Sequence, residues 1–198
     1  MHRLSSSFVL GYHGCDRQVG ECLIDGAQFV VSENDYDWLG SGIYFWETNP
    51  RRGLEFATQL QKWRKGKANE IKEPFVVGAV IEPGLCLDLT TSVGIQAVAA
   101  THADFLDYCE RAGIDPPKNT GGQDFLFRKL DCAVINHFHN IRVAAGLPSF
   151  DVVKGVFIEG SRIYPESGFF EKTHIQLCVR NFACIKGVFR VSEDQLQA

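Results

Sequence analysis

Two short segments carry the residues best suited to hold a ligand. In Tyr12-His13-Gly14-Cys15, a histidine and a glycine end a short apolar stretch. They are expected to face the space beside the edge of that strand. In Gly40-Ser41-Gly42-Ile43-Tyr44-Phe45, glycines precede a run of aromatic residues. A glycine lets a ligand approach the main chain closely, and such a corner can present a flat ring at the mouth of a cleft. The two segments therefore favour a ligand-binding cleft.

Strands and one helix would hold these segments in place. Residues 8–12 read as a strand, and the Ile-Tyr-Phe-Trp run at 43–46 reads as a short buried strand. Asn49-Pro50 then places proline at a first helical position, and Gly66 stops the helix that follows. Its apolar stripe comprises Phe56, Leu60 and Trp63.

The remaining pattern places helices in the middle of the chain and strands toward its ends, which favours one α+β domain. The apolar run at 75–81, between two prolines, predicts a central strand buried on both faces. The other expected strands are 29–31, 85–89, 152–158, 173–180 and 184–190, the last two joined by a tight turn at Asn181-Phe182. The other expected helices are a short turn at 20–25, one from Thr91 or Ser92 to Ala112, and one from Asp124 to about Arg142, after a loop at 115–123.

The His-Gly pair followed some thirty residues later by Gly-x-Gly-Ile-Tyr-Phe, with a late polar strand at 173–180, resembles the ADP-ribosyltransferase superfamily. The similarity is to the branch that includes the poly(ADP-ribose) polymerase catalytic domain, and it spans most of the chain. It implies a split, strongly bent pair of antiparallel sheets, flanked by helices, with NAD in the cleft between them. Residues 1–198 would then be a single ADP-ribosyltransferase-like catalytic domain.

By this resemblance the catalytic residues are His13, Tyr44 and Gln176. His13 would hydrogen-bond a ribose hydroxyl of NAD, and Tyr44 would line the nicotinamide side of the pocket. Gln176 stands where relatives most often have a glutamate that stabilises developing positive charge. A glutamine can orient a hydroxyl but supplies no negative charge, so the step would be slower by ~10²–10³ unless another carboxylate compensates. Glu166 and Glu171 are the nearest candidates in sequence.

The resemblance also assigns contacts to NAD, which would be a co-substrate. The main chain of Gly14 would bind the carboxamide, and Arg17 offers a positive partner for the phosphates. Cys15 is also assigned to the NAD site, although it stands where Ser or Thr is common in relatives and has no hydroxyl to offer. Gly42, which precedes the aromatic run that contains Tyr44, is also assigned to the NAD site. Phe56 is either a second aromatic wall or a core residue, because its spacing is one residue off the family pattern.

The segment 159–172 would correspond to the loop that contacts the target in relatives. Its aromatic residues Tyr164, Phe169 and Phe170 stack on a base or fill a protein pocket in one interpretation and close the core of the loop in the other. Glu171 belongs to the same loop. Basic residues also gather at the end of the helix that starts at Pro50: Lys62, Arg64, Lys65 and Lys67. They compensate the helix dipole on a solvated face or form a nucleic-acid patch.

The leading function is an NAD-dependent mono-ADP-ribosyltransferase that modifies a nucleic acid or a protein, as a bacterial toxin or defence effector with a neutralising antitoxin as a further partner. Relatives without the glutamate generally transfer one unit or none, so polymer extension is not expected. Nucleic acid is the slightly favoured acceptor because of the basic helix end and the aromatic loop. The alternatives are a non-catalytic domain that binds NAD or ADP-ribose, and an RNA 2′-phosphotransferase, which would need more arginine around the cleft.

Composition is that of an ordinary globular protein: 198 residues, 45% hydrophobic and 22% charged, with a net charge of −4. Seven cysteines without CxxC pairs favour reduced thiols, about half of them buried. His137 and His139 would face apart on a helix, so no metal is expected. The run at 8–10 is too short for a signal peptide core, and no stretch is long enough to cross a bilayer, so we expect a cytoplasmic protein with no membrane partner.

Overall fold

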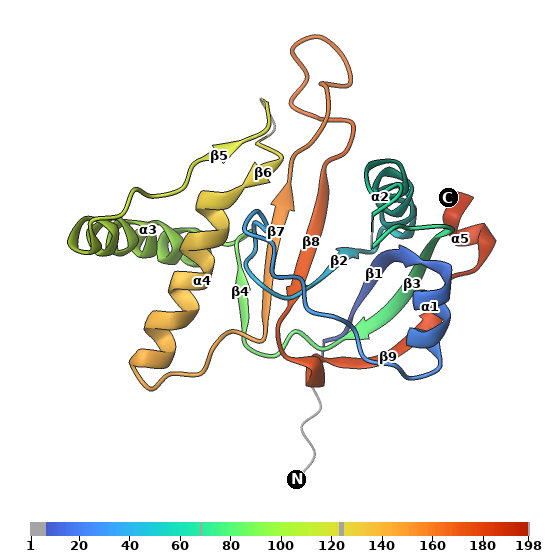
Figure 1. Ribbon diagram of the computed structural model, residues 1–198, viewed down its shortest axis with the longest axis horizontal. Helices are drawn as coiled ribbons and strands as arrows, with labels where there is room; N and C mark the ends of the chain where they lie inside the picture. The colour runs from blue at the N-terminus through green and yellow to red at the C-terminus, as the bar shows by residue number, and fades with distance from the viewer. Residues whose placement is uncertain (1–6, 68, 123–124, 198) are drawn as a thin grey trace. The chain divides into compact units, whose positions relative to one another are not determined.

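The computed structural model describes residues 7–67, 69–122 and 125–197, and these fold into helices and a mixed set of β-strands (Figure 1). The expected α+β class is confirmed. Contacts within the chain divide it into two compact units. Unit 1 comprises Met1–Val30, Tyr44–Pro83 and Asn181–Ala198, and unit 2 comprises Val31–Ile43 and Gly84–Arg180. Each unit is described by itself.

Unit 1 contains antiparallel strands in the order β2-β1-β3-β9. The strands are β1 (Val9–Asp16), β2 (Ile43–Glu47), β3 (Pro74–Ile81) and β9 (Ile185–Arg190), of which Ile43 is counted with unit 2. The helical segments are α1 (Arg17–Ile24), α2 (Pro50–Trp63), the 3-10 turn η1 (Phe182–Cys184) and α5 (Glu193–Gln197). The expected central strand is confirmed as β3, which pairs with β1 on one side and β9 on the other.

Helices α1 and α2 pack on opposite faces of these strands. On one face, Gly53 of α2 lies against Val76 of β3, and Val76 packs with Tyr12 of β1. On the other face, Gly20 of α1 lies against Phe75 and the Cys15 sulfur. Both faces of the strands are therefore covered, which explains why β3 is an unbroken apolar run rather than an alternating one.

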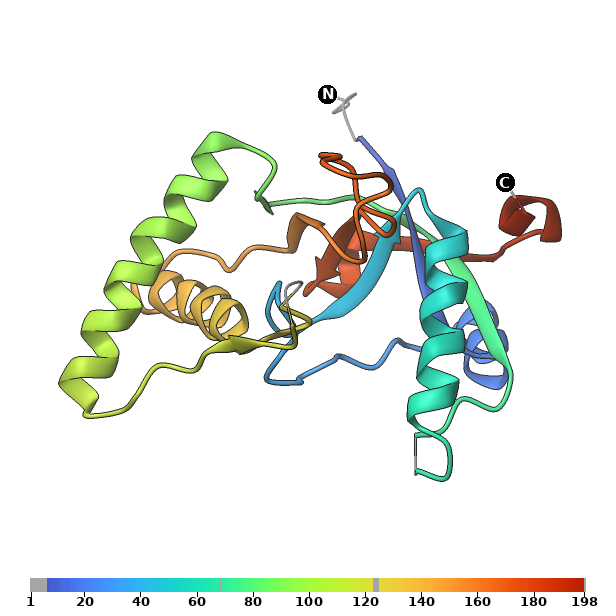
Figure 2. The same ribbon diagram turned by 90° about the horizontal axis from the view of Figure 1, so that it is seen from above.

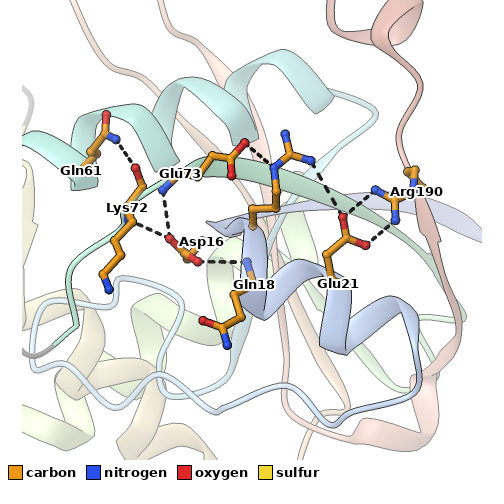
Figure 3. A network of polar contacts seen from close by, with 8 residues as sticks. Asp16, Gln18, Glu21, Gln61, Lys72, Glu73 and Arg190 are labelled. Atoms are coloured by element: carbon orange, nitrogen blue, oxygen red, sulfur yellow. Dashed lines mark hydrogen bonds and ion pairs between the residues drawn. The ribbon is translucent and has the colours of Figure 1, made fainter.

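Helix α1 begins earlier than expected, at Arg17, because Asp16 caps it. The Asp16 carboxylate accepts hydrogen bonds from the main-chain N–H groups of Gln18 (3.0 Å), Lys72 (2.7 Å) and Glu73 (3.1 Å), as Figure 3 shows. Burial alone would raise the pKa of Asp16, but these hydrogen bonds outweigh it and hold the pKa below its usual value. One aspartate thus joins α1 to the segment that enters β3.

Unit 2 contains β4 (Cys86–Asp88), β7 (Val152–Phe157) and β8 (His174–Val179) in the order β4-β7-β8. Strand β4 is parallel to β7, whereas β7 and β8 are antiparallel. The expected wholly antiparallel sheets are therefore wrong for this unit. Helices α3 (Ser92–Ala112) and α4 (Lys129–Ala144) lie side by side, as Figure 2 also shows, and bury Phe105, Cys109 and Val134 between them.

The helix expected from Asp124 instead begins at Lys129. Asp124 and Gln123, the end of the expected loop, lie outside the described residues, and the short strand β6 (Phe127–Arg128) pairs with β5 (Asn119–Thr120). The Asn119 side chain accepts hydrogen bonds from the N–H groups of Leu130 (2.9 Å) and Asp131 (3.3 Å), so a distant residue caps α4. Such a cap leaves no local sequence signal at the helix start.

The expected strand at 29–31 and part of the expected apolar stripe of α2 are wrong, whereas the expected helix α3 is confirmed. Residues 29–31 form no strand, because Phe29 packs on other rings rather than in a ladder. In α2 the buried residues include Arg52 and Ala57, whereas Trp63 of the expected stripe is 62% exposed. Helix α3 runs as expected, with Thr91 as its N-cap and Gly113 in the left-handed region (φ 64°) at its end.

Five of the seven cysteines are buried, more than the expected half. Within residues 7–67, 69–122 and 125–197, no group of three or more His, Cys, Asp or Glu side chains is arranged to hold a metal ion. No helix in that part of the chain is long and apolar enough to cross a membrane.

His139 of α4 is buried beside the Phe150 ring, with the ring centroids 5.8 Å apart. Neither of its ring nitrogens has a hydrogen-bond partner among the described residues. Burial, together with the smaller effect of the Arg180 and Arg142 charges, lowers the pKa of His139 to about 4. The folded protein therefore holds this imidazole neutral.

The stability of the protein should depend on pH through His139. Because its folded pKa lies below its ordinary value, its contribution is fully present above about pH 6.5 and is lost as the pH falls toward 4. We expect the free energy of unfolding to fall by on the order of 2–3 kcal/mol over that interval from this residue alone. Urea unfolding at several pH values should show a shallower pH dependence for His139→Phe than for wild type or the control His102→Phe. Equal slopes for all three would contradict the assignment.

Candidate active site

His13 lies within β1, and one hydrogen bond connects its ring to β2. Its Nδ1 is 2.9 Å from the main-chain oxygen of Tyr44. The ring packs edge-on against Phe29 (centroids 5.3 Å apart) and tilted against Phe45 (5.7 Å). These two aromatic neighbours and the strand pair fix the position of the imidazole.

The protonation of His13 follows from these contacts. The residue keeps some exposed surface, but desolvation of its ring lowers the pKa of His13, and the hydrogen bond to Tyr44 opposes this only in part. The imidazole is therefore neutral at pH 7. A carbonyl oxygen can only accept, so Nδ1 carries the proton and Nε2 keeps its lone pair. Among the described residues Nε2 has no partner, so it can accept a hydrogen bond from a ligand hydroxyl.

The structure brings His13 and Tyr44 together through the main chain. Strands β1 and β2 pair Gly11 with Glu47 and Tyr12 with Trp46. Side chains alternate along a strand, so Tyr44 shares a face of β2 with Trp46 and points away from the face of Phe45, against which His13 packs. The two residues predicted to bind NAD thus project from opposite faces of this strand pair.

Two glycines of the predicted NAD site have a packing role. A Cβ on Gly14 would lie 2.1 Å from the main-chain oxygen of Gly53 in α2. A Cβ on Gly42, in unit 2, would lie 2.4 Å from the Cys178 sulfur and 2.9 Å from the Val179 oxygen. Glycine is therefore required at both positions by close approach of main chain, whether or not a ligand also uses the space.

Cys15 and Phe56 are engaged in packing. Burial raises the pKa of the Cys15 thiol to about 12, so it stays protonated and unreactive at neutral pH. The Phe56 ring lies 4.8 Å from the Trp46 ring, centroid to centroid. Of the two interpretations of Phe56, core packing therefore accounts for its position.

Arg17, the predicted partner of the NAD phosphates, already has acidic neighbours. Its Nε lies 2.5 Å from the Glu73 carboxylate, and a terminal nitrogen lies 3.9 Å from Glu21, which also binds Arg190. Its guanidinium stacks 4.7 Å from the Phe75 ring centroid. Because these side chains are exposed, a phosphate can compete with the carboxylates for Arg17. The arginine is nevertheless already ion-paired when no ligand is bound.

Gln176 is held in a single orientation within unit 2. It lies in β8, and its Oε1 accepts a hydrogen bond of 2.6 Å from the indole nitrogen of Trp38. An indole N–H can only donate, so the amide oxygen faces Trp38. The amide NH₂ group is left without a partner among the described residues. Position 176 therefore presents a hydrogen-bond donor.

The residues that hold Trp38 were missed by the sequence analysis, because few local patterns point to them. The Arg128 guanidinium lies over both the Trp38 ring (5.0 Å) and the Phe157 ring (4.2 Å). Gly155 is the register partner of Gln176, and a Cβ there would lie 2.6 Å from the Trp38 ring. A lone glycine inside the strand Val152–Phe157 was the available signal, because such glycines mark close approach of another group.

The predicted target loop of unit 2 exposes part of its aromatic surface. Tyr164 and Phe169 are 55% and 65% exposed, so they do not close a core. Phe170 is half-buried, with the Arg162 guanidinium 4.9 Å above its ring. The Glu171 carboxylate accepts a hydrogen bond of 3.0 Å from the main chain of the same loop. Packing thus accounts for Phe170, whereas Tyr164 and Phe169 remain available for contact.

No protein-family model matches the sequence, and no solved structure matches it. The chain is similar to an uncharacterized protein of Methanocaldococcus jannaschii, with 32% identity over 83 residues. The match covers 40% of this chain and 36% of that protein, so the chain spans little more than a third of this relative.

Replacing Gly14 by alanine should destabilise the protein in the absence of any ligand, because the new methyl group would collide with the α2 main chain. We expect a loss of about 1–3 kcal/mol in the free energy of unfolding, measured with urea. Gly187→Ala on β9 is the control, since nothing lies within 4 Å of its added Cβ. A Gly14→Ala protein as stable as this control would show that packing does not require the glycine.

Replacing Gln176 by leucine should deprive the Trp38 indole of its hydrogen-bond acceptor. In ¹H–¹⁵N spectra, which show a separate indole signal for each of the three tryptophans, the Trp38 signal should shift and exchange faster with solvent. The loss of one hydrogen bond, about 0.5–1.5 kcal/mol, corresponds to roughly 2- to 10-fold faster exchange. Trp38→Phe assigns the signal, and Trp63 serves as the internal reference. An unmoved Trp38 signal would rule out the bond.

Proposed function

We propose that the protein is an NAD-dependent mono-ADP-ribosyltransferase, which cleaves the bond between nicotinamide and ribose and passes the ADP-ribose unit to a macromolecule. The observation that carries this proposal is the neutral His13 imidazole, fixed by the Tyr44 carbonyl with its Nε2 lone pair unused. The order of the His-Gly pair and the tyrosine corner in the sequence supports it further.

In the proposed reaction the C–N bond breaks and its electron pair leaves with nicotinamide. The ribose becomes oxocarbenium-like, and an oxygen or nitrogen of the acceptor bonds to the same carbon and loses its proton to water. A ribose hydroxyl that donates to Nε2 of His13 gains electron density, which favours the positive charge on the sugar. A neutral imidazole suits this task because an imidazolium could not accept the hydrogen bond.

Gln176 limits what the proposed enzyme can do. With its carbonyl oxygen bound to Trp38, the residue would donate its NH₂ group to a ribose oxygen. This orients the sugar but neither stabilises positive charge nor removes a proton from the acceptor. Single transfer at a modest rate is the outcome that this chemistry favours, in the cytoplasm and in the manner of a toxin or defence effector.

A non-catalytic NAD-binding or ADP-ribose-binding protein is the second candidate. Three predicted NAD contacts are accounted for without a ligand: Gly14 and Gly42 by packing, and Arg17 by its ion pairs. The uncharged Gln176 also fits a protein that holds the ligand without cleaving it. An RNA 2′-phosphotransferase has less support, because Arg17 is paired and Arg52 is buried beside the Trp46 ring.

Transfer of label from adenine-labelled NAD into a cell lysate tests the proposal. Wild type should incorporate label, and His13→Ala should lower the rate on the order of 10²–10³-fold because one preorganised group is lost. His102→Ala, a substitution on α3, is the matched control and should label at the wild-type rate. Melting temperatures of both variants should be compared with that of wild type to exclude unfolding.

The other outcomes separate the candidates. Equal labelling by wild type and His13→Ala would contradict the catalytic site. If NAD binds in a calorimetric titration but no label is transferred, the protein is a binding module. Protease and nuclease treatment of the labelled lysate then identify the class of acceptor.

A further inference from the structure

Exposed cations and an exposed indole gather where α2 ends, and the proposed catalytic step uses none of them. We call this surface the basic end of α2. It comprises Lys62, Trp63, Arg64, Lys65 and Lys67. Trp63 is 62% exposed, and the side chains around it are exposed or half-exposed. Tryptophan is enriched at interfaces, where its ring supplies contact area and its indole N–H a polar handle.

Compensation of the helix dipole accounts for little of this charge. Helix α2 ends at Trp63, so Lys62 alone lies in its last turn and Arg64 is its C-cap. Lys65 and Lys67 follow the helix, and the dipole acts on charges in the last turn. Most of the positive charge therefore has no function within the helix itself.

The four cations are also without acidic partners among the described residues. Several exposed cations elsewhere in the described residues are paired, as in Arg51 with Glu55 and Lys186 with Glu82. The chain as a whole carries a net charge of −4. Four unpaired positive charges within six residues are thus a local feature, not a consequence of a basic protein.

Main-chain and side-chain hydrogen bonds fix the turn that carries these residues. The Arg64 N–H donates to Leu60 (2.8 Å), and the Lys67 N–H donates to Arg64 (2.9 Å). The Gln61 amide donates to the main-chain oxygen of Lys72 at 2.7 Å, a contact drawn in Figure 3. The surface is therefore presented in a defined conformation.

A partner for this surface must offer negative charge and a flat ring together. A single-stranded nucleic acid offers one phosphate per nucleotide for the cations and an unpaired base to stack on Trp63. An acidic peptide would satisfy the lysines but leave the indole without a partner. A duplex keeps its bases stacked on one another and leaves the indole unused as well.

We propose that the basic end of α2 binds single-stranded nucleic acid and is the docking surface for the acceptor of the transferase. The binding follows from the charges, the exposed indole and the ordered turn alone. The acceptor role rests on the proposed function. RNA and DNA share the phosphates and bases that this surface recognises, and the experiment below distinguishes them.

Fluorescence anisotropy with labelled 12-nucleotide single strands of RNA and DNA, and with the matching duplex, tests the binding in the absence of NAD. At least one of the two single strands, RNA or DNA, should bind more tightly than the duplex. With three or four phosphates neutralised, log K should fall with log salt at a slope of about −2 to −3. A preference between the two single strands identifies the natural source.

Variants separate the stacking from the charge. Trp63→Ala should weaken binding by about 5- to 100-fold at every salt concentration, because the stacked base is lost, and Trp63→Phe should restore part of it. The double variant Lys62→Gln/Lys65→Gln should reduce the salt slope by about 1.4. The control is Arg111→Gln/Lys118→Gln, two exposed cations of unit 2, which should bind as wild type does.

The proposal is overturned if no single strand binds at 20 mM salt, if Trp63→Ala binds as tightly as wild type, or if the Arg111/Lys118 control loses as much affinity as the Lys62/Lys65 variant. His13→Ala should bind the strands normally. If the strands bind but take no label from NAD with wild type, the acceptor role fails and the binding surface stands. If label is transferred to protein and no strand binds, the docking proposal fails and the transferase stands.

Discussion

The candidate site depends on one hydrogen bond, between Nδ1 of His13 and the main-chain oxygen of Tyr44. It fixes the tautomer of the imidazole, and the two flanking phenylalanine rings lower its pKa by excluding water. Without this bond the proton could sit on either ring nitrogen. With it, Nε2 of a neutral His13 ring is held at a defined position on β1, where it can accept a hydrogen bond from a ligand hydroxyl.

Close main-chain approach is the constraint that makes this arrangement possible. Gly14, next to His13, lets the main chain of α2 lie directly on β1. In unit 2, Gly155 does the same for the Trp38 ring, which in turn orients Gln176. In both units a glycine beside a functional residue gives the space for the element that positions it. The glycines are therefore structural in the first place, and any contact with ligand is additional.

Local signals in the sequence predicted much of the fold. Pro50 and Gly113 mark helix ends by their backbone preferences, and Thr91 marks one by its capping side chain. The apolar run of β3 marks a strand covered on both faces. The start of α4 was expected too early. It depends on a cap by Asn119, which is distant in sequence, and no local pattern encodes such a cap. For the site, His13, Tyr44 and Gln176 were assigned by the family resemblance, and that assignment stays a prediction. The partners that orient Gln176 could not be predicted, because Trp38 bonds to Gln176 and Arg128 packs on Trp38 only through tertiary contacts.

The most direct test of the account is the state of the His13 ring nitrogens, observed by ¹⁵N NMR at pH 7 with and without NAD. We expect a neutral ring protonated at Nδ1, and a change in the Nε2 signal alone when NAD is added, because that nitrogen then accepts a hydrogen bond. A ring protonated at Nε2 without NAD, or an Nε2 signal that is unchanged at saturating NAD, would contradict it.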